Sequence, residues 1–113
     1  MHFLSRPATP EIDVDEFDDL LRAGSVRVLD VREDWEFRRG RVPGAQSIPL
    51  GQLPTRLAEL PHDKPLAVIC EHGNRSQSAT DFLLARGFEG TVSVRGGTSA
   101  WVRTQRPLAR DKS

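Results

Sequence analysis

The fold of this chain is decided by one stretch, which runs Leu66-Ala67-Val68-Ile69-Cys70-Glu71-His72-Gly73-Asn74-Arg75-Ser76. Its first four residues are apolar without alternation, which is typical of a strand buried on both faces of a parallel sheet. The only cysteine follows, and a helix-like segment then covers residues 77–86. A thiol between a strand and a helix N-terminus is suited to nucleophilic chemistry, because unpaired N–H groups there favour the thiolate. An isolated cysteine also packs as a small hydrophobe, so its position leaves both interpretations open.

The composition predicts one small globular domain. The chain has 113 residues, of which 37% are hydrophobic and 28% charged, and its formal net charge is +0. This balance argues against nucleic acid and membrane partners. A single cysteine excludes an intramolecular disulfide and a four-cysteine metal site. No apolar run reaches the roughly 20 residues of a membrane span, and the first residues lack a signal-peptide core, so we expect a cytoplasmic protein.

Apolar patterns along the chain predict strands that alternate with helices. Strands are expected over residues 26–29, 47–50, 66–69 and 91–94. Helices are expected over residues 14–21, 33–39 and 77–86, on the face shared by Leu53, Leu57 and Leu60, and around Ala100 and Trp101. Asp13 is placed to cap the first helix. This alternation predicts an α/β domain with a mostly parallel sheet.

The chain divides into three parts by its composition. We expect an irregular segment over residues 1–10, the folded domain over residues 11–103, and a polar, basic and loose tail over residues 104–113. Both Trp35 and Trp101 are expected to be packing residues.

Two polar groups follow predicted strands directly. Asp30 and Arg32 lie at the end of one strand, and Cys70 lies at the end of another. Ligands of parallel α/β sheets sit beyond the carboxyl ends of the strands. We therefore expect Asp30 and Arg32 to form a pair that braces the Cys70 loop, or to contact substrate.

The loop after Cys70 has the composition of an anion-binding nest. Gly73 permits backbone angles that a side chain would forbid, and successive N–H groups from residues 71–75 could then point at the sulfur. Arg75 adds fixed charge or a structural clamp, with Ser76 beside it in support. His72 could add a proton donor, whereas Glu71 is expected to face solvent because it opposes anion binding.

This loop, Cys70-x-x-Gly73-x-Arg75-Ser76, resembles the active loop of single-domain rhodanese-like sulfurtransferases. Two other stretches resemble the signatures of that family: Asp30-Val31-Arg32-Glu33 with Glu36-Phe37, Gly40-Arg41-Val42-Pro43-Gly44-Ala45 and Ile48-Pro49-Leu50, and then Val94-Arg95-Gly96-Gly97 with Ala100-Trp101. Together they span roughly residues 11–103. Arg41 stands where the family often has His, and Glu71 is a less typical loop residue.

The resemblance implies a rhodanese-like fold with a sheet of about five strands and helices on both faces. It implies that Cys70 is the catalytic nucleophile and that Glu71, His72, Gly73, Asn74 and Arg75 form the substrate and anion-binding loop. The implied partners are a small anionic sulfur donor such as thiosulfate and a thiol or cyanide acceptor, with a protein sulfur partner as a further option. Neither a metal nor an organic cofactor is implied.

Several alternatives use the same residues. A non-catalytic rhodanese-like module could carry sulfur or bind a partner, although inactive members typically lose the cysteine. Tyrosine-phosphatase-type loops place five residues between cysteine and arginine, whereas four separate Cys70 from Arg75. Zinc binding through Cys70 and His72 lacks further ligands at zinc-site spacing, with His62 expected in a solvated loop. A thiol–disulfide oxidoreductase would carry a second cysteine where Gly73 stands.

Overall fold

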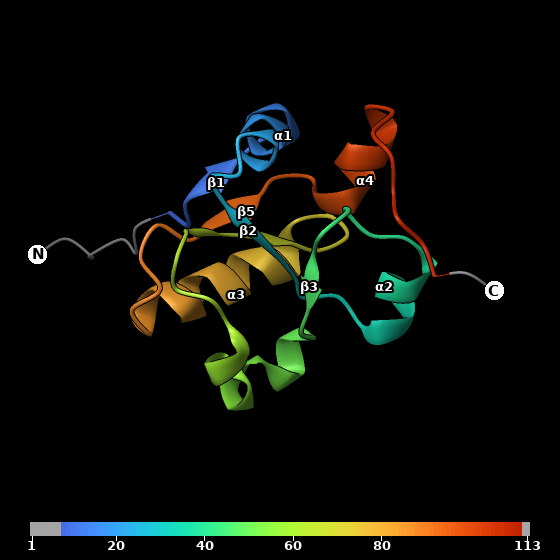
Figure 1. Cartoon of the computed structure of the whole chain (residues 1–113). Helices are drawn as coiled ribbons and strands as arrows, with labels where there is room; N and C mark the ends of the chain where they lie inside the picture. The colour runs from blue at the N-terminus through green and yellow to red at the C-terminus, as the bar shows by residue number, and fades with distance from the viewer. Residues whose placement is uncertain (1–7, 112–113) are drawn as a thin grey trace, which may run out of the picture.

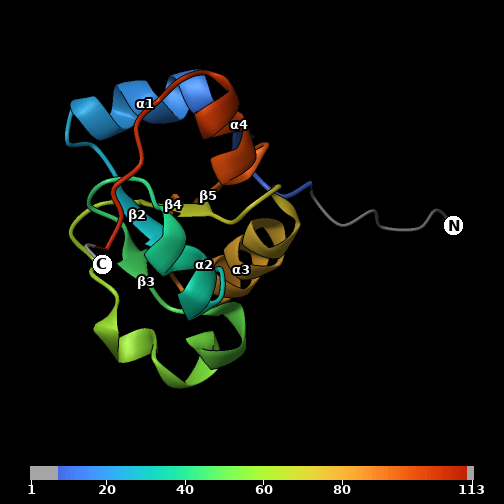
Figure 2. The ribbon, with the colours of Figure 1, turned by 90° about the vertical axis from the view of Figure 1, so that its right-hand side faces the viewer.

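The computed structural model describes residues 8–111 and contains a five-stranded parallel sheet with helices on both faces (Figures 1 and 2). The strands are β1 (Glu11–Ile12), β2 (Arg27–Asp30), β3 (Gln46–Ser47), β4 (Leu66–Ile69) and β5 (Val92–Val94), in the order β1-β5-β4-β2-β3. Each pair of neighbours is parallel. The predicted α/β class is confirmed. The short edge strand β1 was not predicted, because two residues carry no readable period.

The helices are α1 (Val14–Arg22), α2 (Asp34–Arg39), α3 (Asn74–Ala85) and α4 (Gly97–Arg103), with two 3₁₀ turns, η1 (Leu50–Thr55) and η2 (Leu57–Glu59). Figure 2 shows α1 and α4 on one side of the sheet and α3 with the two 3₁₀ turns on the other. The predicted cap of α1 is confirmed, since the Asp13 carboxylate accepts from the Glu16 N–H at 2.9 Å.

Alternation along the strands divides the core into two apolar clusters. Val28 and Ile69 face α1 and α4 and join a cluster with Trp101. Leu29 and Val68 face the opposite way and join a cluster with residues of α3 and the 3₁₀ turns. All four residues of β4 are buried, as expected of a central strand covered on both faces.

Two predicted elements are wrong in detail. The helix predicted from Leu53, Leu57 and Leu60 is the pair of 3₁₀ turns, because Pro54 supplies no N–H and the backbone at Arg56 leaves the helical region with φ −123°. The strand predicted over residues 47–50 consists of Gln46–Ser47 alone, and a proline at position 49 cannot donate to a sheet.

The described part of the tail is not loose. Ala109 pairs with Arg41 in an antiparallel bridge, and the Trp101 indole donates to the Pro107 carbonyl at 2.8 Å. Arg106 binds two carboxylates of α1, and Leu108 packs against the first apolar cluster. The expected loose tail is therefore wrong for residues 104–111, because Arg106 finds partners on α1 and α4 and the backbone of the last residues pairs with the segment that ends α2. The first seven residues of the predicted irregular segment lie outside the described residues.

The carboxyl ends of the central strands meet at one edge of the sheet. Asp30 of β2 stands opposite Ile69 of β4 in the parallel register, and Cys70 follows directly. Beyond β5, Gly96 turns the chain into α4. The register therefore brings the segments around Asp30, Cys70 and Gly97 together. Across residues 8–111 no helix has the length and apolarity that crossing a bilayer requires.

Candidate functional site

The Cys70 sulfur is enclosed by the loop that follows it. The residue is 1% exposed, and its Sγ accepts hydrogen bonds from the Gly73 N–H at 3.1 Å and the Ser76 N–H at 3.3 Å. The N–H groups of residues 71–75 were predicted to point at the sulfur. Of these residues, Gly73 makes the predicted hydrogen bond, and the second donor, Ser76, lies just beyond that range. Two N–H donors directed at one sulfur are placed to stabilise negative charge on it during a reaction. Cys70 also belongs to the second apolar cluster, so the packing interpretation and the anion interpretation each describe one side of the sulfur.

The loop takes this shape because its carbonyls are bound elsewhere. The Cys70 and Glu71 carbonyls accept from the Thr98 and Ser99 N–H groups of α4 at 2.9 and 3.0 Å. The approach requires glycine at position 97, where a Cβ atom would lie 2.1 Å from the Cys70 oxygen. Gly73 adopts φ +109° at the start of α3, as its expected backbone freedom suggested. With the carbonyls turned toward α4, the N–H groups are left to face the sulfur.

A buried pair of hydroxyls lies beneath the sulfur. Ser76 Oγ is 3.5 Å from the Cys70 thiol and donates to the Gly73 carbonyl at 3.0 Å. Ser93 Oγ of β5 lies 2.7 Å from Ser76 Oγ, and both serines are fully buried. Ser93 was missed from the sequence, although a serine between two valines in a predicted buried strand is a usable signal.

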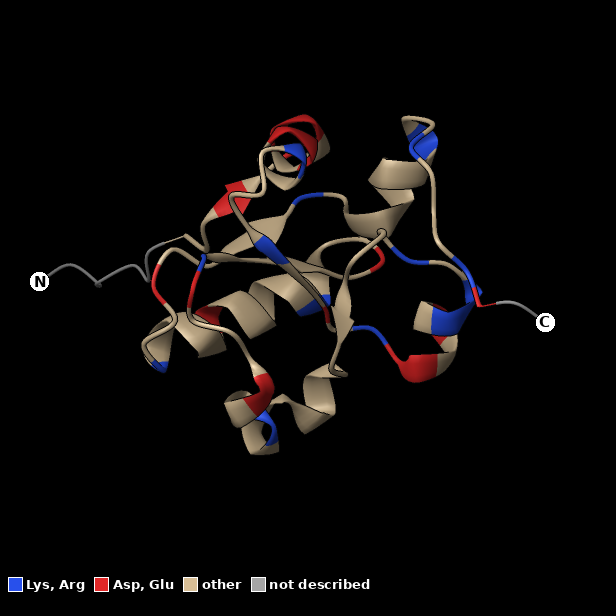
Figure 3. Cartoon of the chain, in the orientation of Figure 1, with Lys and Arg blue, Asp and Glu red and all other residues tan. Residues whose placement is uncertain are grey.

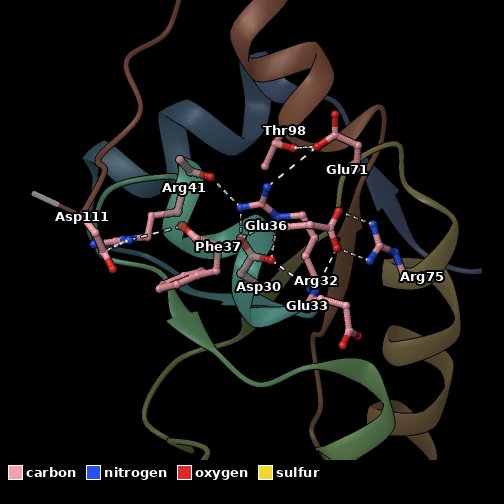
Figure 4. A network of polar contacts seen from close by, with 11 residues as sticks. Asp30, Arg32, Glu33, Glu36, Phe37, Arg41, Glu71, Arg75, Thr98 and Asp111 are labelled. Carbon is pink, nitrogen blue, oxygen red and sulfur yellow. Dashed lines mark hydrogen bonds and ion pairs between the residues drawn. The ribbon is translucent and has the colours of Figure 1, made fainter. Parts of the chain in front are cut away.

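Arg75 serves as a clamp between two helices. Its guanidinium donates to both carboxylate oxygens of Glu36 of α2, at 2.7 and 3.0 Å (Figure 4). This contact is the main reason that the pKa of Glu36 falls from 4.5 to about 2, against the opposing effect of burial. The same pair raises the pKa of Arg75. The clamp joins the start of α3 to α2. Glu36 was quoted in the sequence motif but was not expected as a site residue.

Asp30 and Arg32 form the predicted brace. Their side chains are 0% and 4% exposed, and they meet at 2.7 Å. Arg32 also donates to the Gly40 carbonyl at 2.8 Å, and its Nη1 lies 3.8 Å from the Glu71 carboxylate. Figure 4 shows Arg32 between the Asp30 and Glu71 carboxylates. One buried cation therefore joins the end of β2 to the Cys70 loop.

Glu71 is partly exposed, as expected of a residue that faces solvent, but neighbouring donors also hold its carboxylate. Its carboxylate accepts from the Thr98 hydroxyl at 2.8 Å, while its side chain is 42% exposed. The helix α4 and Arg32 hold it at the mouth of the loop because each offers a donor there. His72 is exposed in the loop, whereas Asn74 is exposed as the first residue of α3, which begins before the predicted start at residue 77.

A groove of about 560 Å³ borders the loop. Its walls come from α2 and α4, and its lining includes Trp35, Arg39, Glu71, Val102 and Leu108. The expected packing role is confirmed for Trp101, which is buried against Phe17, but is wrong for Trp35, which is 60% exposed.

The metal alternative finds no geometric support in the described region. Within residues 8–111, no three or more His, Cys, Asp or Glu side chains come together as a metal site. His62 instead stacks on Phe88 with ring centroids 4.4 Å apart, on an exposed loop as predicted.

Known proteins share this sequence and architecture. The model of the rhodanese-like domain family matches residues 13–104. A sulfurtransferase from Allochromatium vinosum is 32% identical over 83 residues, which cover 74% of this chain and 78% of that protein. Thiosulfate sulfurtransferase GlpE from Shewanella oneidensis is 33% identical over 90 residues, covering 80% and 89%. The crystal structure of a rhodanese-related protein from Thermoplasma volcanium has a TM-score of 0.84 at 33% identity and covers 90% of this chain and 99% of that one.

Proposed function

Because this chain belongs to the rhodanese-like domain family, we propose that it is a sulfurtransferase that moves a sulfane sulfur through a persulfide on Cys70. The observation that carries the proposal is the pair of N–H donors, from Gly73 and Ser76, on the Cys70 sulfur. The relatives named sulfurtransferase and thiosulfate sulfurtransferase support the same reaction class.

In the first step the Cys70 thiolate attacks the outer sulfur of a donor such as thiosulfate. A bond forms between Sγ and that sulfur, the sulfur–sulfur bond of thiosulfate breaks, and sulfite leaves with the electron pair. Cys70 then carries a persulfide anion. Such nucleophilic catalysis divides one difficult transfer into two easier displacements.

In the second step an acceptor thiolate or cyanide attacks the outer sulfur of the persulfide. The Cys70 thiolate leaves with the electron pair and is ready for another cycle. Negative charge stays on sulfur in both steps, so the N–H donors of the loop stabilise each of the states. The Ser76 hydroxyl, 3.5 Å from Sγ, is positioned to add a third donor when it turns from the Gly73 carbonyl. These displacements require neither a metal nor an organic cofactor.

Intact-mass measurement after incubation with thiosulfate tests the first step. The protein should gain the mass of one sulfur atom, and reduction with excess thiol should remove it. Cys70→Ser should show no gain. Absence of the adduct in protein whose thiol still alkylates would contradict the thiosulfate reaction. The same incubation with mercaptopyruvate or a protein persulfide would then test whether another compound is the sulfur donor.

Turnover separates the remaining candidates. Release of thiocyanate from thiosulfate and cyanide is expected of an enzyme, whereas a persulfide that forms without turnover identifies a sulfur-carrying module. Hydrolysis of an aryl phosphate without persulfide formation would identify a phosphatase. The phosphatase is disfavoured because Arg75 binds Glu36 with both of its terminal nitrogens and is not free to bind phosphate.

A further inference from the structure

We propose that the groove between α2 and α4 binds the sulfur acceptor, and that this acceptor is a protein cysteine flanked by a basic and an apolar side chain. The proposal rests on the proposed function, because it names the acceptor for the second displacement. Its starting point is the position of the groove, whose lining includes Glu71, the residue next to the reactive cysteine.

Exposed apolar side chains gather in this groove. In the described part of the chain, Trp35 and Val102 are the large hydrophobic residues that stay exposed, at 60% and 49%. They come from α2 and α4, and both line the groove. Most large apolar side chains of a small domain are buried, so two exposed ones in one groove indicate a surface that a partner covers. Tryptophan is also the residue type most enriched at the energetic centres of protein interfaces.

The size of the groove argues against a small inorganic ligand. Its volume of about 560 Å³ lies in the range of sites that hold organic ligands or peptide segments. Thiosulfate or cyanide would leave most of it empty. A loop of a partner protein can fill it, with an apolar side chain against Trp35 and Val102 and a cysteine at the end nearest Cys70.

The charges of the groove select the neighbour of that cysteine. Arg75 neutralises Glu36, and Arg32 lies between two carboxylates, those of Asp30 and Glu71. One guanidinium between two carboxylates leaves one negative charge uncompensated. Glu71 is the more exposed of the two carboxylates, so this charge stands at the groove beside the reactive loop. It attracts a lysine or arginine of the partner and repels an acidic one.

The far end of the groove carries the opposite charge. Arg39, the last residue of α2, is exposed, and its guanidinium lies 5.8 Å from the Trp35 ring centroid. Figure 3 shows the corresponding basic segment at the end of α2 and the acidic loop position near the start of α4. A partner segment therefore binds in one orientation, with its cysteine and basic residue beside Glu71 and the rest of the segment toward Arg39.

The transfer itself conserves atoms and electrons. The partner thiolate attacks the outer persulfide sulfur, a new sulfur–sulfur bond forms on the partner, and the bond to Cys70 Sγ breaks. The Cys70 thiolate leaves with the electron pair, and the sulfur moves without any external oxidant or reductant. Because a persulfide places its outer sulfur about 2 Å beyond Sγ, that atom is the one that an acceptor has to reach.

The test uses the full chain, first charged with thiosulfate and freed of donor, with the persulfide confirmed by intact mass. Its decay is then followed with three acceptors: a peptide with cysteine between lysine and leucine, one of equal length with cysteine between glutamate and glycine, and cysteamine, a small cationic thiol. We expect the first peptide to react about tenfold faster than either other acceptor at low salt. That advantage should shrink as salt is added.

Two variants connect the preference to the groove. Glu71→Gln should bring the two peptides to nearly equal rates, and Trp35→Ala should slow the lysine–leucine peptide while leaving cysteamine unchanged. Glu89→Gln, at an exposed position outside this groove, is the matched control and should retain the wild-type ratio. Normal charging of Trp35→Ala and Glu89→Gln by thiosulfate shows that their loops are intact. For Glu71→Gln, intact mass gives the fraction that carries the persulfide, and the decay rates with the two peptides are compared within that fraction.

The outcomes distinguish the two proposals. If the wild-type protein forms no persulfide with any donor, the proposed function is what fails. If a persulfide forms but decays equally with both peptides, or if the preference survives in Glu71→Gln, the charge selection proposed here is wrong. Equal rates for cysteamine and the lysine–leucine peptide would overturn the protein partner in favour of a small cationic thiol.

Discussion

The two ends of strand β2 carry the same kind of ion pair in opposite surroundings. At its amino end Arg27 meets Asp63 at 2.6 Å, with side chains 49% and 51% exposed. At its carboxyl end Asp30 meets Arg32 at 2.7 Å, with side chains 0% and 4% exposed. Figure 3 shows charge at both ends of this strand. A pair in water contributes little because solvent already stabilises each charge, whereas a buried pair must stay intact because neither charge can reach water.

Breaking each pair in turn gives the largest expected contrast. Arg32→Leu should lower the free energy of unfolding by about 3–5 kcal/mol, since it leaves the Asp30 carboxylate buried without a cation. Arg27→Leu should leave the urea midpoint nearly unchanged. Equilibrium urea unfolding of both variants measures the difference. Equal losses of unfolding free energy in the two variants would show that burial does not make the Asp30–Arg32 pair more important for stability than the exposed Arg27–Asp63 pair.

Two glycines extend the comparison to the backbone. Gly97→Ala should cost about 3 kcal/mol, because a Cβ atom 2.1 Å from the Cys70 oxygen forces α4 off the loop. Gly24→Ala, before β2, has the same kind of positive φ but no backbone atom near its Cβ, and should cost about 1 kcal/mol. Thermal unfolding compares them, and persulfide formation should be lost in Gly97→Ala alone. A Gly97→Ala protein with normal sulfur loading would contradict the role of the α4 contact.

The Glu36–Arg75 pair predicts a specific dependence on pH. The folded pKa of Glu36 is about 2, below its ordinary 4.5, so the stabilisation is present above pH 4.5 and is lost as the pH falls toward 2. Glu36→Gln should therefore be less stable than the wild type at pH 7 by about 2 kcal/mol after allowance for solvent screening. The two proteins should converge near pH 2–3. Urea midpoints between pH 2 and pH 7 measure the difference in stability between the two proteins. Asp63→Asn, which breaks the exposed pair at the amino end of β2, is the control.

The buried hydroxyls predict the smallest effect. When Ser76 donates to the Gly73 carbonyl, its one proton is used, so Ser93 must donate to Ser76 Oγ. Ser93→Ala removes that donor and should slow iodoacetamide alkylation of Cys70 about threefold at neutral pH, because the Ser76 hydroxyl is then a weaker donor once it turns from the Gly73 carbonyl to the thiolate. Ser78→Ala, at an exposed position of α3, should alkylate at the wild-type rate. An unchanged alkylation rate in Ser93→Ala would show that the hydrogen bond from Ser93 to Ser76 does not affect the reactivity of Cys70.

Local patterns in the sequence determined the class of fold and the place of the proposed nucleophile. An unbroken apolar run made β4 a buried strand, and the alternation of strands and helices required a parallel sheet. The family resemblance followed from three short motifs in order. Each of these signals lies within a few residues, where side-chain period and backbone preference act directly.

Tertiary structure decided which side chains serve the loop. Glu36, Ser93 and Thr98 lie far from Cys70 in the sequence, and only the parallel register and the packing of α2 and α4 bring them to it. The same packing placed Glu71 at the mouth of the loop and left Trp35 exposed in the groove. Such contacts depend on long-range distances that no local pattern encodes. The sequence therefore determined the position of the proposed nucleophile, and the fold determined the neighbours that are proposed to choose its partner.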